Sequence, residues 1–375
     1  MSNPRKKVAA GLKYFWLNYL GRELQGKAFR FLTRAASLGQ SISFNEHIRD
    51  FRRVLVLLPD NPYEILLTQK SLIALKDHHP DMTLDVIAES VNRDVVKSNP
   101  CIDNGYFYSK HEYLYNHISY RELIRTLKER NYQACFIFKQ DVSPLDLIVA
   151  AQSGAPLRVG FAGGDAAPFL NLTVRPRKDI EYEGDKYESL VRTLGVRTNR
   201  SRLKWDIAKT TERDVEGLLV EAGYRIDQPL IGLNISPGIS GRSLPPDLII
   251  RLAMELRKNS NAEIILFHSG AREAADVKEL EELNRHVVPI SEDKISFAAA
   301  FVYKCDLIVS LNNLIYQLAI ILDRPVVGLF ENLEHRRWAL FQAGKAEIVN
   351  AARLRNLRAE DVLAGVSRIQ SSTKA

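Results

Sequence analysis

Apolar and polar positions along the chain follow a repeating order, in which short apolar runs alternate with longer stretches of helical period. The clearest example is the segment 306–330. Residues 307–311 form an apolar run of strand length, 314–322 carry apolar residues at helical spacing, and 326–330 form a second apolar run. Pro325 disfavours helical geometry in the residue before it, so the helix is expected to end there. A strand, a helix and a strand in this order need a parallel crossover, which predicts the core of an α/β domain.

The same order continues through most of the chain and predicts two such units. They are expected over residues 51–205 and 206–375, with the boundary in the mixed, charged stretch 196–228. Alternating strands and helices are typical of doubly wound parallel sheets. Strands are predicted at 54–58, 84–88, 106–108, 134–138 and 158–161, and then at 230–234, 263–268, 287–290, 307–311 and 326–330. Helices are predicted at 64–76, 95–99, 120–130, 143–153 and 181–194, and then at 211–222, 246–258, 271–283, 296–304, 314–322 and 359–369.

Residues 1–50 follow a different pattern. Apolar and aromatic residues recur every three or four positions over residues 8–35, with Lys and Arg between them, which predicts an amphipathic helix. Aromatic residues on one face and cations on the other suit the surface of an anionic membrane. A helix that packs its apolar stripe on the body or on a partner subunit has the same period, so both interpretations stay open. Residues 36–50 are polar and are expected to form a linker.

The formal net charge of +7 lies in this first segment. Residues 1–34 contain eight basic side chains and one acidic side chain, a difference of seven, so the rest of the chain is neutral. A neutral body argues against a nucleic-acid-binding surface. The three cysteines are far apart and form no CxxC pair, which favours a reduced, cytoplasmic compartment. No apolar run is long enough to cross a membrane, and no secretory signal is evident.

Candidate chemistry begins at the turn Asn312-Asn313. This turn follows the carboxyl end of a predicted strand and precedes the amino end of a predicted helix. Ligands of open α/β sheets bind at that edge, and free backbone N–H groups at a helix start favour anions.

Four segments carry a family resemblance that covers roughly residues 53–370. They are Tyr63 to Lys76, Gly232 to Pro245, Ser269 to Glu273 and Asn312 to Glu331. In order and spacing they resemble motifs of the ADP-heptose:lipopolysaccharide heptosyltransferases, glycosyltransferase family 9. The resemblance implies a GT-B fold, in which two Rossmann-like doubly wound domains face a cleft; here the amphipathic helix would precede them.

Several polar positions depart from the family pattern. Tyr63-Glu64 stands where the family has Gly-Asp, and Gln317 stands where it has His. Asn312-Asn313-Leu314 replaces Asp-Thr-Gly, and Arg242-Ser243-Leu244 replaces Lys-Arg-Trp. The apolar framework predicts the fold, and the altered polar positions are the reason to consider an inactive protein of the same fold as an alternative.

The resemblance implies Glu64 as the catalytic base. A glutamate in the first turn of a helix is also common for electrostatic reasons alone, so both interpretations stay open. Asp60 is a second candidate base, and an ordinary turn aspartate is the alternative for it.

The nucleotide-sugar site is expected on the second unit. Arg242 can form forked hydrogen bonds with a diphosphate, and the glycines at 238 and 241 let the loop approach a ligand. Each of three residues also has an ordinary interpretation that stays open. Arg242 could be a solvated loop arginine, Asn313 could only cap the helix, and Glu273 could be an exposed helix acid. The Gln317 amide does not ionise at neutral pH, so it can form hydrogen bonds but cannot act as an acid or a base. The expected nucleotide-sugar ligands are Ser236, Gly238, Arg242, Glu273, Asn312, Asn313, Leu314 and Gln317.

The resulting hypothesis is an inverting glycosyltransferase that uses a nucleotide-diphosphate sugar, most simply an ADP-sugar, and a lipopolysaccharide-type or other lipid-linked glycan acceptor. Residues 1–35 would hold it at the inner face of the cytoplasmic membrane. An inactive GT-B scaffold or binding protein is the alternative, and an epimerase of the same build is a third possibility. No cluster of His, Cys and carboxylates has ligand spacing, so neither a metal nor a cofactor is expected.

Overall fold

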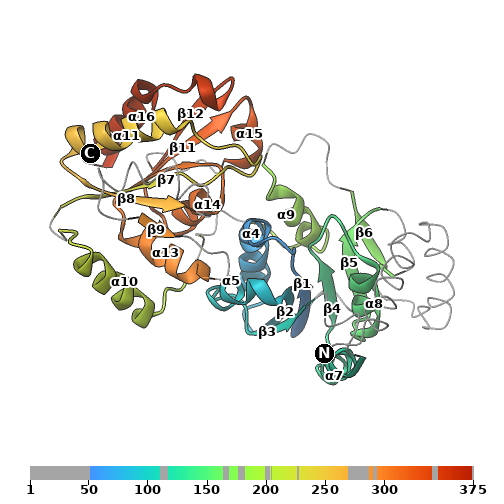
Figure 1. Cartoon of the computed structure of the whole chain (residues 1–375). Helices are drawn as coiled ribbons and strands as arrows, with labels where there is room; N and C mark the ends of the chain where they lie inside the picture. The colour runs from blue at the N-terminus through green and yellow to red at the C-terminus, as the bar shows by residue number, and fades with distance from the viewer. Residues whose placement is uncertain are drawn as a thin grey trace, which may run out of the picture.

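The computed structural model describes residues 51–109, 117–163, 169–175, 182–198, 203, 205–225, 228–268, 287–289, 294–339 and 345–373. The predicted amphipathic helix at 8–35, the linker at 36–50 and the predicted helix at 271–283 lie outside these residues. Figure 1 shows two lobes side by side, one built from the earlier and one from the later part of the described chain.

The first lobe contains a parallel six-stranded sheet in the order β3-β2-β1-β4-β5-β6. Its register pairs Val54 of β1 with Leu84 of β2 and with Ala134 of β4. The strands are β1 (Arg53–Leu57), β2 (Thr83–Glu89), β3 (Asn104–Tyr108), β4 (Ala134–Ile137), β5 (Leu157–Phe161) and β6 (Leu172–Val174). The helical segments are α4 (Pro62–His78), η1 (Ser90–Asn92), α5 (Arg93–Lys97), α7 (His117–Glu129), α8 (Pro144–Gln152) and α9 (Asp185–Arg192).

The second lobe repeats this plan with the order β12-β11-β10-β7-β8-β9. Ile231 of β7 pairs with Leu307 of β10 and with Ile264 of β8. The strands are β7 (Leu230–Asn234), β8 (Glu263–His268), β9 (Val287–Pro289), β10 (Leu307–Leu311), β11 (Val326–Glu331) and β12 (Ala346–Ala351). The helical segments are α10 (Lys209–Glu221), α11 (Pro246–Ser260), α13 (Ile295–Lys304), α14 (Leu314–Ile321), α15 (Glu334–Trp338), η4 (Leu354–Asn356) and α16 (Ala359–Thr373).

Both sheets therefore have the strand order of a doubly wound α/β fold. The order reverses between β1 and β4 in the first lobe and between β7 and β10 in the second. In such sheets the ligand crevice lies at the carboxyl ends of the strands beside this reversal. The predicted fold class, two Rossmann-like parallel sheets, is confirmed.

Local sequence explains where the two helices nearest these reversals begin. The Asn61 side chain accepts a hydrogen bond from the Tyr63 N–H at the start of α4, and Pro62 occupies the first turn. The Asn313 side chain caps α14 in the same way by accepting from the Ile315 N–H. After α14, Asp323 adopts a left-handed conformation with φ 59° ahead of Pro325, which ends the helix where the sequence predicts.

Two edge strands, β6 and β12, are missing from the sequence-based prediction. The β6 strand has three residues, of which none is fully buried, and β12 carries the half-exposed Glu347 and the exposed Asn350. Neither strand is a continuous apolar run, because an edge strand has a less buried environment than a central one. The short helix α15 and the 3-10 turns η1 and η4 are also missing from the prediction, because segments of three to five residues are too short to show a helical period. The other differences among the described elements are shifts of a few residues at their ends.

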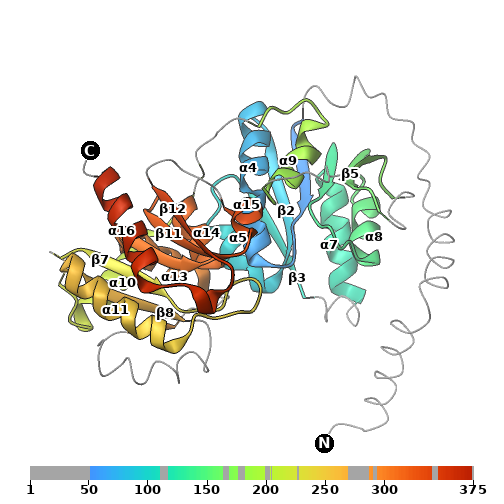
Figure 2. The same cartoon turned by 90° about the horizontal axis from the view of Figure 1, so that it is seen from above.

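The lobes touch along their helices, and α4 lies at the junction in both Figure 1 and Figure 2. The α4 helix faces α14, and α5 faces α13, where the Ser296 N–H donates to Asp94 Oδ2 at 2.7 Å. A single cluster of buried apolar residues continues across the junction and includes Ile65 and Ile315. Because a continuous apolar contact resists sliding and opening, the lobes are held together at this point.

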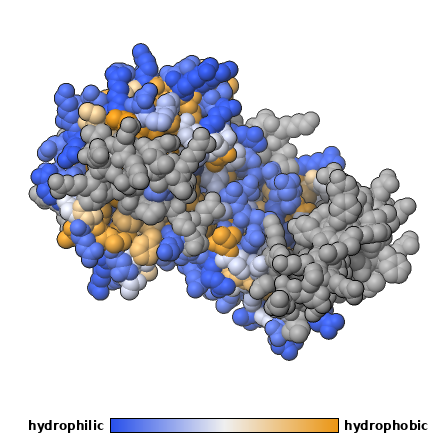
Figure 3. All heavy atoms as spheres, viewed as in Figure 1, coloured by the Kyte–Doolittle hydropathy of each residue, from blue (hydrophilic) through white to orange (hydrophobic). Residues whose placement is uncertain are grey.

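The described part of the face in Figure 3 is mainly hydrophilic, with apolar side chains exposed in small groups. Within the described residues, no helix combines the length and the apolar character needed to cross a membrane.

Candidate functional site

The strand reversal of the second sheet is held by a network of short polar side chains. Asn234 Nδ2, at the end of β7, donates to Ser310 Oγ at 2.9 Å and to Asn313 Oδ1 at 2.8 Å. Asn313 Nδ2 in turn donates to the carbonyl oxygens of Ser236 and Pro237 at 3.3 and 3.2 Å. Asn313 therefore ties the loop after β7 to the start of α14. Its amide is occupied by protein groups, so its predicted contact with a diphosphate would require this network to rearrange.

The loop after β7 folds over the turn after β10. The Ile239 N–H donates to the Asn312 carbonyl at 2.9 Å, and the Gly238 N–H donates to the Arg242 carbonyl at 2.9 Å. Gly241 has φ 73°, a conformation that favours glycine. At Gly238 an added Cβ would meet its nearest atom at 3.5 Å, an ordinary contact, so Gly241 is the position where the turn depends on glycine.

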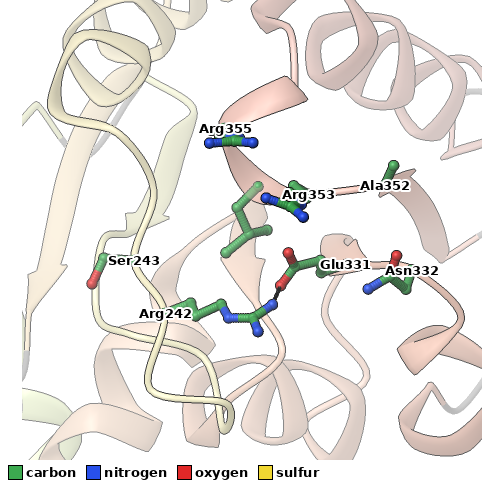
Figure 4. A pocket seen from close by; sticks show the side chains of 8 residues that line it. Arg242, Ser243, Glu331, Asn332, Ala352, Arg353 and Arg355 are labelled. Atoms are coloured by element: carbon green, nitrogen blue, oxygen red, sulfur yellow. Dashed lines mark hydrogen bonds and ion pairs between the residues drawn. The ribbon is translucent and has the colours of Figure 1, made fainter.

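Arg242 extends from this loop towards the end of β11, where it forms an ion pair with Glu331 (Figure 4). The Arg242 side chain is 60% exposed, whereas the Glu331 side chain is only 5% exposed. The pKa of the neighbouring Glu334 is raised by burial and by the Glu331 carboxylate, and the positive charge of Arg242 reduces this rise. Arg242 therefore lies at the carboxyl edge of the sheet, and its guanidinium is held by a carboxylate that the sequence interpretation missed.

The side chains at three altered family positions meet across the lobe junction. The Tyr63 hydroxyl donates to Asn312 Oδ1 at 2.9 Å, and Gln317 Nε2 donates to the Tyr63 hydroxyl oxygen at 3.1 Å. Tyr63, Asn312 and Gln317 are 6%, 2% and 1% exposed. Burial raises the pKa of Tyr63 far above its ordinary value, so the phenol stays neutral and acts as both donor and acceptor.

Trp338 completes this contact from α15. Its ring lies 5.6 Å from the Tyr63 ring, and its carbonyl accepts from Gln317 Nε2 at 3.3 Å. The residue interpreted from sequence only as a departure from the family glycine is thus the centre of a buried hydrogen-bonded contact. We call Tyr63, Asn312, Gln317 and Trp338 the junction contact.

Glu64 lies beside the junction contact in the first turn of α4. It is half-buried, and its Oε2 accepts a hydrogen bond from the Tyr187 hydroxyl at 3.3 Å. Burial, and then the Glu64 carboxylate, raise the pKa of Tyr187, which therefore remains a neutral donor. A carboxylate that is partly exposed can accept a proton from a hydroxyl group placed next to it.

Asp60 has a different environment. Its Oδ1 accepts from Lys139 Nζ at 2.8 Å, and the same ammonium group donates to Asp146 at 2.7 Å and to the Tyr108 hydroxyl at 3.0 Å. Although burial lowers it, the pKa of Lys139 is raised overall, chiefly by Asp146. Asp60 is thus held by a buried, charged partner, whereas the hydrogen bond that Glu64 accepts comes from a neutral phenol. Lys139 directly follows a strand, a sequence signal that the prediction did not use.

The structure says less about the other predicted ligands. Leu314 is half-buried at the start of α14, and Glu273 lies outside the described residues. Ser236 is buried, and among described groups neither its hydroxyl nor Asn312 Nδ2 has a hydrogen-bond partner. Within the described chain, no three His, Cys, Asp or Glu side chains are arranged to hold a metal ion.

Comparisons with known proteins place this fold. No family model and no curated protein matches the sequence. A family 9 glycosyl transferase from Veillonella parvula aligns over 87% of this chain and 99% of its own, with a TM-score of 0.74 and 18% identity. ADP-heptose lps heptosyltransferase II of E. coli aligns over 86% of this chain and 100% of its own, with a TM-score of 0.70 and 18% identity. An E. coli heptosyltransferase with ADP covers 85% of this chain and 98% of its own, at a TM-score of 0.62 and 15% identity. The resemblance stated from the sequence is confirmed for the fold, at a sequence identity that leaves room for the altered motifs.

Proposed function

We propose that this chain is an inverting glycosyltransferase that binds a nucleotide-diphosphate sugar between its two lobes. The observation that carries the proposal is the contact of Tyr63 with Asn312, two residues 249 positions apart in sequence. Through this contact the candidate base, Glu64, is brought next to the turn after β10, where the nucleotide site is expected. The GT-B fold supports the same assignment.

In the proposed reaction Glu64 accepts the proton of an acceptor hydroxyl group. The hydroxyl oxygen forms a bond to the anomeric carbon while the bond from that carbon to the diphosphate oxygen breaks. Arg242 and the backbone N–H groups at the start of α14 stabilise the negative charge on the departing diphosphate. Because the entering and leaving groups lie on opposite faces of the carbon, its configuration is inverted.

For the donor we propose an ADP-sugar, a heptose or a related sugar, and for the acceptor a lipopolysaccharide-type or other lipid-linked glycan. The support is the fold shared with heptosyltransferases, one of them described with ADP and another as acting with ADP-heptose on lps. Because Tyr63 places a buried aromatic side chain where the family has glycine, we propose that the junction contact opens before a sugar lies beside Glu64.

The junction contact also favours a second candidate function, an inactive scaffold or binding protein of the same fold. Tyr63 is bulky where the family has glycine, and its hydroxyl is engaged by two residues of the other lobe. If this contact never opens, the sugar has no place next to Glu64 and the chain does not transfer it.

Nucleotide binding separates these two functions. We expect ADP to bind more tightly than GDP or UDP in calorimetric titrations, and Arg242→Ala to weaken ADP by about tenfold because a charge-assisted hydrogen bond is lost. The matched control is Arg251→Ala, which removes an exposed arginine paired with Glu360 away from the site. If none of the three nucleotides binds, the scaffold is the better description.

We further propose that residues 1–35 hold the protein at the inner, cytoplasmic face of the membrane. The support is the basic, aromatic and amphipathic sequence of this segment. Deletion of residues 1–36 is expected to abolish co-sedimentation with anionic vesicles, while neutral vesicles should pellet little of either form. Equal pelleting of the shortened and complete chains by anionic vesicles would contradict the anchor.

A further inference from the structure

A pocket of about 750 Å³ opens at the carboxyl ends of β11 and β12, beside the loop that follows β7. Its lining combines Arg242 and Ser243 from that loop with Glu331 and Asn332 after β11 and residues 352–355 after β12. Figure 4 shows Arg242 reaching towards Glu331, with Arg353 and Arg355 on the segment beyond them. The pocket therefore has cationic groups from two separate segments of the second lobe.

The three arginines are not equivalent. Arg242 is held by the buried Glu331 carboxylate, so one positive charge of the pocket is neutralised. Arg353 and Arg355 are exposed, and neither guanidinium has a hydrogen bond or ion pair with a described residue. Other exposed arginines of this lobe do have carboxylate partners, such as Arg251 with Glu360 and Arg368 with Glu347. Three arginines and one carboxylate leave a net charge of +2 around the pocket.

We propose that this pocket binds a phosphate-bearing ligand, either a diphosphate or a phosphate monoester, through Arg353 and Arg355. Guanidinium groups form planar, forked hydrogen bonds that match phosphate oxygens, and two of them balance a doubly charged anion. The pocket lies at the same carboxyl edge of the sheet as the strand reversal between β7 and β10, but at the neighbouring strands β11 and β12. The pocket is larger than a diphosphate alone needs, which leaves space for the group that carries it.

Glu331 would repel an anion if its carboxylate were free. The Glu331 carboxylate is instead buried and paired with Arg242. This ion pair holds the Arg242 guanidinium at the rim of the pocket. The carboxylate thus positions one cation, while the two arginines after β12 supply the excess charge. This assignment does not require sugar transfer, since it concerns only the binding of a phosphate group by the segment after β12.

The test is calorimetric titration of the complete chain with inorganic pyrophosphate at low salt. We expect binding that weakens as salt is added, because exposed charges are screened. Arg353→Gln and Arg355→Gln should each weaken binding by about tenfold, and the double variant by about a hundredfold, since each removes a charge-assisted contact. Both side chains are exposed, so these variants are expected to fold. Arg251→Gln serves as the matched control and should bind as the wild type does.

The proposal is overturned if wild-type protein fails to bind pyrophosphate at millimolar concentrations, or if the double variant binds it within twofold of the control. Competition with ADP then identifies the source of the phosphate. If ADP displaces pyrophosphate and is weakened by the same variants, the pocket holds the diphosphate of a nucleotide. If ADP and pyrophosphate bind together, the pocket holds a phosphate of another ligand, such as a phosphorylated glycan. Either result keeps the pocket as a phosphate site, while absence of sugar transfer would bear on the proposed function alone.

Discussion

Replacing Glu64 by Gln is expected to slow sugar transfer by about 10²- to 10⁴-fold, the usual contribution of a general base. Glutamine has nearly the same shape and can still accept a hydrogen bond from Tyr187, but it cannot take a proton from an acceptor hydroxyl group. The assay is release of nucleoside diphosphate from a nucleotide sugar, first with water and then with glycan acceptors. Nucleotide affinity is expected to remain within about twofold of the wild type, because Glu64 is not placed in the diphosphate site.

Asp60→Asn separates a catalytic carboxylate from one that holds the structure. Asp60 is an ion-pair partner of the buried Lys139, so its loss should lower stability more than the chemical rate constant of the folded protein. If Glu64→Gln transfers sugar at the wild-type rate while Asp60→Asn is inactive but folded, the base has been assigned to the wrong residue.

Tyr63→Phe is expected to destabilise the protein by roughly 1–3 kcal/mol, because it leaves the buried Asn312 Oδ1 without this donor, whereas Gln317 Nε2 keeps the Trp338 carbonyl as an acceptor. Both groups are deeply buried, so water cannot easily replace the phenol. The measurement is urea-induced unfolding followed by tryptophan fluorescence, to which Trp338 contributes from its position 5.6 Å from the Tyr63 ring.

Tyr187→Phe is the matched control for this change. It also removes one phenolic hydroxyl, but the partner left behind, Glu64, is half-exposed and can be hydrated. Its expected cost is below about 1 kcal/mol. Equal losses in the two variants would show that the hydrogen bonds of the junction contact do not set the stability of the lobe interface.

The junction contact has a consequence for ligand binding. A donor that needs the lobes apart beside Glu64 must first break this contact. An opening cost of roughly 1–3 kcal/mol would reduce the apparent affinity by about 5- to 150-fold. A nucleotide that binds away from Tyr63 would not require the contact to open. The difference in affinity between a nucleotide and its nucleotide sugar therefore measures the free energy of opening the junction contact.

Much of the fold could be predicted because buried strands and helices show up in the sequence as apolar runs or as apolar residues at helical spacing. The central strands β1, β7 and β10 consist mainly of buried apolar residues, since both faces of a doubly wound sheet are covered. The edge strands β6 and β12 carry exposed positions and left no such run. The helix at 8–35 and the role of Glu273 lie outside the described residues and stay predictions.

The candidate site could be predicted only in part. The loop of Arg242 and the cap at Asn313 follow from their positions after strands, which the sequence displays directly. The long-range partners did not follow: Glu331 pairs with Arg242, Lys139 with Asp60 and Tyr63 with Asn312. The two members of each pair lie far apart in sequence and carry no periodic signal. The exposed Arg353 and Arg355 were missed for a different reason: the strand before them, β12, was not predicted.

The sequence by itself determined the order of strands and helices, the two α/β units and the starts of α4 and α14, because these depend on the spacing of apolar residues and on caps within a few positions. Only the tertiary structure decided which polar side chains meet: Tyr63 with Asn312 and Gln317, Asp60 with Lys139, and Arg242 with Glu331. Such pairs depend on how separate strands and the two lobes pack against one another, a long-range geometry that local spacing does not encode.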